Sequence, residues 1–435
     1  MVNPPGEGAG VGMVPAPAPV LPPSGLDTLL AKGRLRATLG MLGPAFVAAI
    51  AYVDPGNFAT NIAGGAQFGY LLLWVVLVAN LMAMLIQYLS AKLGIVTDAN
   101  LPELCRRRFP RPVSWGLWVQ AEIMAMSTDV AEFIGAALGL NLLFGVPLLG
   151  AGVITGVLAF GILGLQRHGY RPFEIAITAL LGIIFVGFLY ETLRIGPDAR
   201  ASLRGLIPAF AGGDSAVLAV GIIGATVMPH AIYLHSALTK NRVPCRDDAQ
   251  RARVLGFERL DVIVALGLAG LVNMAMLAVA AKLFHDGGHP DISTIEQAHA
   301  GLGTLIGSGA ALVFAVALLA SGASSSSVGT YAGQVVMSGF VNRTIPLTVR
   351  RAITMAPALL LLGIGADPTT TLVYSQVVLS FGIPFALIPL VLLTANPAVM
   401  GVHVNRRVTT AAAGVLAALI TGLNGYLIYQ QLRGG

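Results

Sequence analysis

The stretch that decides the fold is Ala-Tyr-Val-Asp-Pro-Gly-Asn-Phe-Ala-Thr at residues 51–60, which interrupts an apolar run. Pro55 has no backbone N–H, and its ring clashes with the preceding helical turn. Asp54 costs about 2.5–3.5 kcal/mol at the centre of a bilayer on insertion scales. Unwound backbone at that depth is tolerated only where it lines a cavity or is buried in protein. We therefore predict a helix that is broken at a functional site rather than a simple proline kink.

A second interruption lies further along the chain, in Gly-Ile-Ile-Gly-Ala-Thr-Val-Met-Pro-His-Ala-Ile-Tyr-Leu-His-Ser at residues 221–236. Met228, Pro229 and His230 break this otherwise apolar helix. The two breaks fall in the first and sixth apolar stretches, so spans 1–5 and 6–10 are expected to form two inverted halves. Paired broken helices in matching positions are the best sequence indication of a substrate site in a transporter.

The composition supports a membrane protein throughout. Hydrophobic residues make up 56% of the 435 residues and charged residues 11%, whereas soluble domains carry about 25% charged residues. This excludes a soluble enzyme, a disordered hub and a nucleic-acid binder. A bilayer requires about 20 apolar residues per helix, and eleven such stretches are predicted. They are 42–66, 69–94, 113–140, 144–164, 173–190, 215–240, 261–284, 302–327, 352–365, 370–393 and 409–430.

These stretches define one all-α transmembrane domain, 38–435, with repeats at about 42–190 and 215–393 and an extra helix at 409–430. Residues 1–37 are rich in Pro, Gly and Ala and are expected to form a disordered cytoplasmic tail.

The basic residues predict the orientation. Most of the 26 Lys and Arg residues fall on one set of alternate loops, and such residues are enriched in cytoplasmic loops. This places the N-terminus inside, and eleven spans then place the C-terminus outside. Cys105 and Cys245 fall on predicted inner loops, where thiols stay reduced.

The two breaks offer an ion site. Unwinding frees backbone carbonyls near Ala51 and Ala225, while Asp54 supplies a carboxylate, Asn57 an amide oxygen and Met228 a thioether. Oxygen ligands alone suit calcium or magnesium, and a thioether adds a preference for softer transition metals. Met228 by itself is more often a packing residue, but its place beside the second break favours a ligand. Gln376 in the tenth span is a further candidate oxygen ligand.

A second polar path follows the third span. At 100° per residue, Glu122, Asp129 and Glu132 share one helix face, and intramembrane acids of this kind relay protons or pair with cations. Their expected partners are His230, His235, Arg242, Arg350 and Arg351. A static salt-bridge network is the alternative, and the two roles can coexist.

Three motifs resemble the signatures of the Nramp family (natural resistance-associated macrophage proteins). They are Asp54-Pro55-Gly56-Asn57, Met228-Pro229-His230, and Gly333-Gln-Val-Val-Met-Ser-Gly339-Phe340. The resemblance extends from about residue 34 to 430 and includes the third span and the Arg350-Arg351 pair. The chain departs from many members at Ala231 and Ile232, where Asn-Leu is common, but that Asn is no ligand in the family.

The resemblance implies a LeuT-like fold, eleven or twelve spans in an inner (plasma) membrane, and import of Mn²⁺ or Fe²⁺ coupled to protons, with Co²⁺ and Cd²⁺ as further cargo. The implied metal ligands are Asp54, Asn57, Met228, Gln376 and the carbonyls of Ala51 and Ala225. The implied proton residues are Asp54, Asp129, Glu132, His230, Arg242, Arg350 and Arg351.

Other functions remain open at this point. A sodium-coupled amino-acid or small-solute carrier would use the same fold, although Met228 in place of a polar or small residue disfavours it. An intramembrane metalloenzyme would require several His at ligand spacing, which the seven His residues do not provide. A passive channel is a further alternative, and the chain has no Walker motif for ATP. We expect no resident cofactor and no obligate protein partner.

Overall fold

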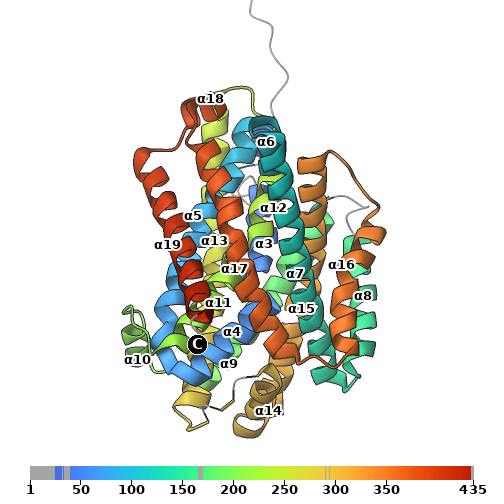
Figure 1. Cartoon of the computed structure of the whole chain (residues 1–435), viewed down its shortest axis with the longest axis vertical. Coiled ribbons are helices and arrows are strands. Elements are labelled where there is room, and N and C mark those ends of the chain that lie inside the picture. Colours follow the sequence, from blue (N-terminus) through green and yellow to red (C-terminus); the bar gives the residue numbers. More distant parts are fainter. Residues whose placement is uncertain are drawn as a thin grey trace, which may run out of the picture.

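The computed structural model describes residues 25–31, 33, 40–164, 170–289, 291–292 and 294–432, which are almost entirely helical (Figure 1). The principal helices are α3 (Pro44–Ala49), α4 (Pro55–Phe68), α5 (Leu73–Thr97), α7 (Arg111–Phe144), α8 (Leu148–Gly164), α9 (Tyr170–Ile195), α11 (Gly213–Thr226), α12 (Pro229–Thr239), α13 (Asp248–Ala280), α15 (Ser308–Val341), α16 (Leu347–Gly363), α17 (Pro368–Thr394) and α19 (Arg407–Leu432). The shorter elements are α1 (Gly25–Leu30), η1 (Ile50–Tyr52), η2 (Gly69–Leu72), α6 (Leu101–Arg108), α10 (Ala199–Arg204), the π-helix η4 (Ala281–His285), α14 (Ile295–Leu305), α18 (Pro397–Met400) and η5 (Gly401–His403).

Eight helical segments of the described chain are long and apolar enough to cross a membrane, and Leu148–Ile162 is a shorter apolar helix. One of the eight, Pro55–Thr97, runs through parts of two predicted spans, and another, Gly213–Thr239, includes the second break. Helices therefore cover the predicted apolar stretches, while the total of eleven spans stays a prediction.

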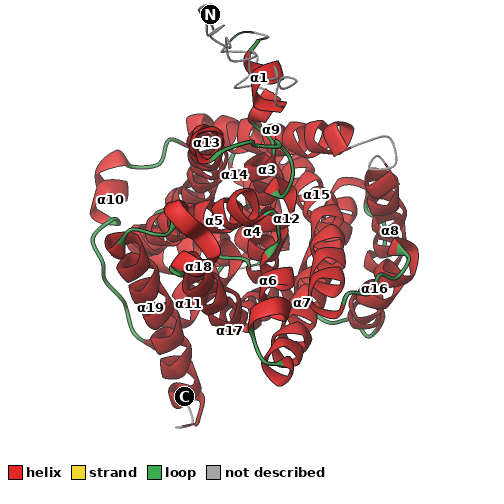
Figure 2. Ribbon diagram, turned by 90° about the horizontal axis from the view of Figure 1, so that it is seen from above, coloured by secondary structure: helices red, strands yellow, loops and turns green. Residues whose placement is uncertain are grey.

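The broken segments lie at the centre of the bundle. Figure 2 shows α4, α5 and α12 in the middle, α8 and α16 on one side, and α10 and α19 on the opposite side. The helices α7 and α15 pack closely along each other, and α13 packs against α4 and α5. A Cβ at Gly322 of α15 would lie 2.5 Å from the backbone nitrogen of Ala136 in α7. Small residues thus let these helices approach to backbone contact, as is common in membranes.

One predicted span boundary is wrong. The eighth span was expected to begin at residue 302, but α14 ends at Leu305 and α15 begins at Ser308. Gly307 between them has a φ of 126°, a conformation that L side chains rarely adopt. The chain therefore turns at Gly307, within a stretch whose hydropathy predicts one continuous span.

The predicted disordered tail is also wrong in part, because residues 25–30 form the helix α1. Leu26 is fully buried against Met41, Ile95, Val254 and Leu255, and burial of this apolar side chain fixes the segment onto α5 and α13. Residues 1–24, which are the larger part of the predicted tail, lie outside the described residues.

Candidate metal site between two helix breaks

The first break separates η1 from α4. Val53 has φ −136° and ψ 48°, and Asp54 is extended and caps α4, accepting a hydrogen bond of 2.9 Å from the Asn57 backbone N–H. Pro55 is the first residue of α4, a position where the missing N–H costs nothing. The freed carbonyl of Tyr52 accepts from Asn273 Nδ2 at 2.7 Å, and that of Val53 from Ser321 Oγ at 2.6 Å. Side chains of α13 and α15 therefore satisfy the unwound backbone.

The second break separates α11 from α12. Thr226 ends α11, Val227 has φ −104° and ψ 79°, and Met228 is extended at the position before Pro229, which begins α12. Val227 and Met228 are fully buried. Met228 therefore holds the same place relative to its proline as Asp54 does in the first break.

The two breaks meet through Asn57. Its Nδ2 donates to Asp54 Oδ1 at 3.0 Å and to the carbonyl oxygen of Ala225 at 3.1 Å. Gln376 of α17 reaches the same carboxylate, with 3.5 Å between its Nε2 and Asp54 Oδ2. Asp54, Asn57 and Gln376 are each fully buried. The structure thus brings together Asp54, Asn57, Gln376 and the Ala225 carbonyl, with Ala51 and Met228 buried in the adjoining turns.

Two glycines make this meeting possible. A Cβ at Gly56 would lie 1.9 Å from Gln376 Nε2, and one at Gly224 would lie 2.0 Å from the Gln376 carbonyl oxygen. Both distances are far below van der Waals contact, so α4 and α11 admit α17 only because these positions carry no side chain.

The chemistry of this cluster is that of a cation site. Among the described residues, Asn57 Oδ1 and Gln376 Oε1 are buried and accept no hydrogen bond. Buried oxygens without a donor are costly, and here they flank a fully buried carboxylate. The described part of the chain contains no group of three or more His, Cys, Asp or Glu side chains suited to a metal. A metal at the breaks would therefore depend on amide, thioether and carbonyl donors around one carboxylate.

The acids of α7 form a second cluster beside α15 and α16. A Cβ at Gly329 would lie 2.5 Å from Glu132 Oε2 and 3.0 Å from Asp129 Oδ1, so both carboxylates face the same glycine. Arg351 interacts electrostatically with both acids. Within the described ranges, neither oxygen of Glu132 has a hydrogen-bond donor in good geometry, although Ser325 lies beside it.

The two neighbouring arginines of α16, Arg350 and Arg351, have different hydrogen-bond and ion-pair partners. Arg351 is fully buried and donates to the Ser326 carbonyl at 2.6 Å, to Ser326 Oγ at 2.6 Å and to Thr330 Oγ1. Arg350 forms an ion pair of 2.7 Å with Glu122. The predicted association of the third-span acids with both arginines is therefore present in the structure.

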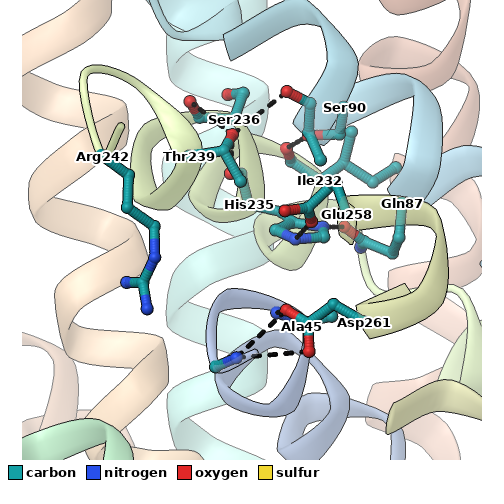
Figure 3. Close-up of polar contacts among 12 residues, drawn as sticks. Ala45, Gln87, Ser90, Ile232, His235, Ser236, Thr239, Arg242, Glu258 and Asp261 are labelled. Atoms are coloured by element: carbon teal, nitrogen blue, oxygen red, sulfur yellow. Dashed lines mark hydrogen bonds and ion pairs between the residues drawn. The ribbon is translucent and has the colours of Figure 1, made fainter. Parts of the chain in front are cut away.

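The two histidines of α12 contact different helices. His230 Nδ1 lies 3.2 Å from Thr128 Oγ1, next in sequence to Asp129, so His230 connects the second break to α7 through a hydroxyl group and not through an acid. His235 was expected to be a partner of the same acids, and that is wrong. Its Nε2 lies 2.9 Å from Glu258 Oε1, and its Nδ1 lies 2.9 Å from Gln87 Oε1 (Figure 3). Five residues of helix after His230 turn His235 toward α5 and α13.

Arg242 also joins a different cluster. It forms a two-pronged ion pair with Glu174 of α9, one contact being 3.1 Å from Nη2 to Oε2. Nearby, Asp261 of α13 accepts from the backbone N–H groups of Gly43, at 3.2 Å, and Ala45, at 2.9 Å, at the start of α3. Sequence reasoning missed Glu174, Glu258 and Asp261. The helical i, i+3 spacing of the last two was the available signal, but the charged residues from 247 onward suggested a loop.

The comparisons with known proteins identify the family to which the chain is similar. A family model described as natural resistance-associated macrophage protein-like (Nramp) matches residues 45–430. A divalent metal cation transporter, MntH, of Deinococcus radiodurans is 53% identical over 400 residues, covering 92% of each chain. The protein of the same name in Bacillus subtilis is 52% identical over 409 residues, covering 94% of this chain and 96% of its own.

Solved structures show the same likeness. A variant of the Eremococcus coleocola manganese transporter matches with a TM-score of 0.84 and 34% identity, over 92% of this chain and 88% of that one. A nucleobase-cation-symport-1 family transporter in a closed conformation matches with a TM-score of 0.54 at 16% identity, which shows a common fold alone.

Proposed function

This chain belongs to the Nramp family and is a membrane-embedded transporter of divalent metal ions rather than an enzyme; we propose that it imports Mn²⁺ or Fe²⁺ into the cytoplasm together with protons. Co²⁺ and Cd²⁺ are proposed as further cargo. The metal is the substrate of transport and not a resident cofactor.

The observation that carries the proposal is the buried carboxylate of Asp54 with unsatisfied oxygens around it. A divalent cation that loses water in a low-dielectric interior requires a counter-charge, and Asp54 is the anion at the breaks. The Asn57 amide group now donates to Asp54 and to the Ala225 carbonyl. A cation would compete for those same lone pairs, so we propose that its entry turns Asn57 to present Oδ1.

The remaining ligands supply selectivity and closure. We propose the Met228 thioether, the carbonyls of Ala51 and Ala225, and Gln376 Oε1 as the other ligands. A thioether favours transition metals over Ca²⁺ and Mg²⁺. Gln376 belongs to α17, so its contact with Asp54 would couple metal binding to the position of that helix.

Protons are proposed to leave Asp54 through α7. His230 touches Thr128, and Asp129 and Glu132 follow on the same helix beside Arg351. The Glu122–Arg350 ion pair continues this series of charges. In this proposal the Arg242–Glu174 ion pair joins the inner ends of α9 and α12. Arg242 therefore affects the proton route only indirectly, by fixing the positions of these two helices.

The charge pattern predicts the orientation of the chain, and the membrane potential favours inward transport. Basic loops are proposed to face the cytoplasm, with the N-terminus inside and the C-terminus outside. An inward-negative potential then favours uptake, because each positive charge gains about 2.3 kcal/mol per 100 mV.

The test is uptake of radiolabelled manganese by proteoliposomes in which pH and membrane potential are set independently, with an internal pH dye. We expect manganese uptake that an inward-negative potential accelerates, accompanied by internal acidification. Unlabelled Fe²⁺ and Cd²⁺ should compete, whereas amino acids with sodium should not. Manganese uptake without acidification at any pH would overturn the proton coupling, and sodium-dependent amino-acid uptake would favour the carrier alternative.

A further inference from the structure

A groove on the side of the bundle belongs to neither polar cluster. It has a volume of about 540 Å³ and lies between α7, α17 and α19, within the roughly 300–1,000 Å³ typical of ligand pockets. Its walls include Val113 and Leu117 of α7, Phe385 and Ile388 of α17, and Gly425 and Ile428 of α19. Val113, Phe385 and Ile428 are about half exposed, so in a membrane the groove opens toward lipid.

A specific contact between α17 and α19 fixes two of the walls of the groove. Pro384 in α17 has no N–H for the carbonyl of Ser380 one turn earlier. Asn424 of α19 replaces that donor at 2.9 Å and accepts from Ser380 Oγ at 2.8 Å. Asn424 thus satisfies the Ser380 carbonyl that Pro384 leaves without a donor. This contact holds α19 at a defined position on α17, and the groove therefore has a defined shape.

A basic cluster adjoins in sequence the residue at one end of the groove. Phe109 lines that end, and Arg106, Arg107, Arg108 and Arg111 surround it in sequence at the junction of α6 and α7. The last three are exposed, and within the described residues none of the four forms an ion pair. This junction lies at the upper end of the bundle in Figure 1, beyond the length of α7 that lines the groove.

We propose that the groove holds an acyl chain of an anionic phospholipid, with the phosphate group on the arginines that flank Phe109. Lipid tails are as apolar as the groove, so a chain gains little hydrophobic free energy by entering it. Selection must therefore come from shape and from the headgroup. Basic pockets at the ends of transmembrane helices bind anionic headgroups, and here a basic cluster without ion pairs flanks Phe109, which lines the apolar groove.

The test is native mass spectrometry of the full chain in detergent, titrated with phosphatidylglycerol and with phosphatidylcholine of the same acyl chains. We expect phosphatidylglycerol to bind on the order of tenfold more tightly, as several arginines at an anionic surface allow. The double variant Arg108→Gln, Arg111→Gln should remove this preference. The matched control Arg200→Gln, Arg204→Gln lies at the opposite end, on α10 (Figure 1), and should retain it.

A second pair of variants tests the groove itself. A Cβ at Gly425 meets no atom within 4 Å, so Gly425→Leu should fold and partly fill the groove. It should weaken binding of both lipids severalfold, whereas Gly414→Leu, equally open on α19 but outside the groove, should not.

Three results would overturn the proposal. One is equal binding of the two lipids by the wild type. Another is phosphatidylglycerol binding by Gly425→Leu that is as tight as in the wild type, which would indicate a surface cluster without a groove site. The third is loss of a dimer rather than of lipid in Gly425→Leu, which would assign the groove to a second copy of the chain.

Discussion

Met228 contributes a different kind of donor atom from the oxygens around it, and its loss should change selectivity more than affinity. A neutral thioether worth roughly 1–2 kcal/mol would cost about tenfold in manganese affinity. Met228→Ala should therefore keep measurable manganese transport, lose proportionally more cadmium transport, and admit Ca²⁺, because water can fill the vacated position. Calcium uptake and manganese competition in proteoliposomes measure this. A folded, manganese-active variant that still excludes calcium would make Met228 a packing residue.

Asp129 should separate proton movement from metal binding. It lies on α7, beside Glu132 and Gly329, and not among the oxygens at the breaks. Asp129→Asn keeps the shape of the side chain but removes its proton-accepting charge, so proton flux and the pH or voltage dependence of uptake should weaken while metal binding persists. Calorimetric manganese binding alongside dye-monitored proton flux checks both. Loss of metal binding with proton flux intact would make Asp129 a ligand.

At the residue scale, the sequence predicts the cluster around Asp54 better than the arrangement of the charged residues. Asp54, Asn57 and Gln376 are polar residues inside apolar stretches, and few arrangements other than mutual contact satisfy them. The partner of Arg242 could not be predicted in this way. Glu174 is far away in sequence and lies near the predicted start of a span, so only the folded chain, which places the segment after α12 beside the start of α9, brings the pair together.

At the element scale, the closeness of α4 to α7 yields a stability prediction. A Cβ at Gly135 of α7 would lie 2.0 Å from Pro55 Cβ, so Gly135→Ala must displace the first turn of α4. Overpacking of this kind costs about 1–3 kcal/mol, and the thermal midpoint in detergent should fall. Gly116→Ala, on the same helix with open space around it, is the control and should hold or raise the midpoint. Equal midpoints would show that α4 and α7 can separate freely.

The breaks themselves were predictable because proline and a polar residue interrupt an apolar run, and both prolines do begin new helices. The end of α14 was missed, since residues 302–327 were read as one apolar stretch, although Gly307-Ser308-Gly309 within it is a turn signal. Hydropathy reports the environment of a segment, whereas a turn depends on the backbone angles of one residue.

At the scale of the whole molecule, the orientation of the chain can be tested through Cys245. This half-buried thiol lies between α12 and α13, and burial raises its pKa above the ordinary value. The thiolate is the nucleophile, so labelling by a membrane-impermeant maleimide should be slow at pH 7 and increase toward pH 9. We expect labelling in inside-out vesicles and not in intact cells. Labelling of intact cells would reverse the topology, and Cys245→Ala, which retains only the buried Cys105, should abolish the signal.

The LeuT-like architecture was accessible from sequence through the resemblance of the three motifs to the Nramp family, and the breaks in the first and sixth apolar stretches added the expectation of two related halves. The polar network where α3, α5, α12 and α13 meet was not accessible, because it joins Gln87, His235, Glu258 and Asp261, which carry no common motif (Figure 3). Such long-range polar contacts follow from the assembled bundle and not from any local pattern.

The central claim is that the metal passes between the two breaks and is held there by Asp54. The most direct test compares radiolabelled manganese uptake by wild type, Asp54→Asn and Glu191→Gln in proteoliposomes with equal protein incorporation. Glu191 is a buried acid of α9 outside the breaks and serves as the matched control. Asp54→Asn should reduce uptake on the order of a hundredfold or more, since a buried charge without its partner costs about 3–5 kcal/mol, while Glu191→Gln should transport normally. Near-normal uptake by Asp54→Asn would contradict the account.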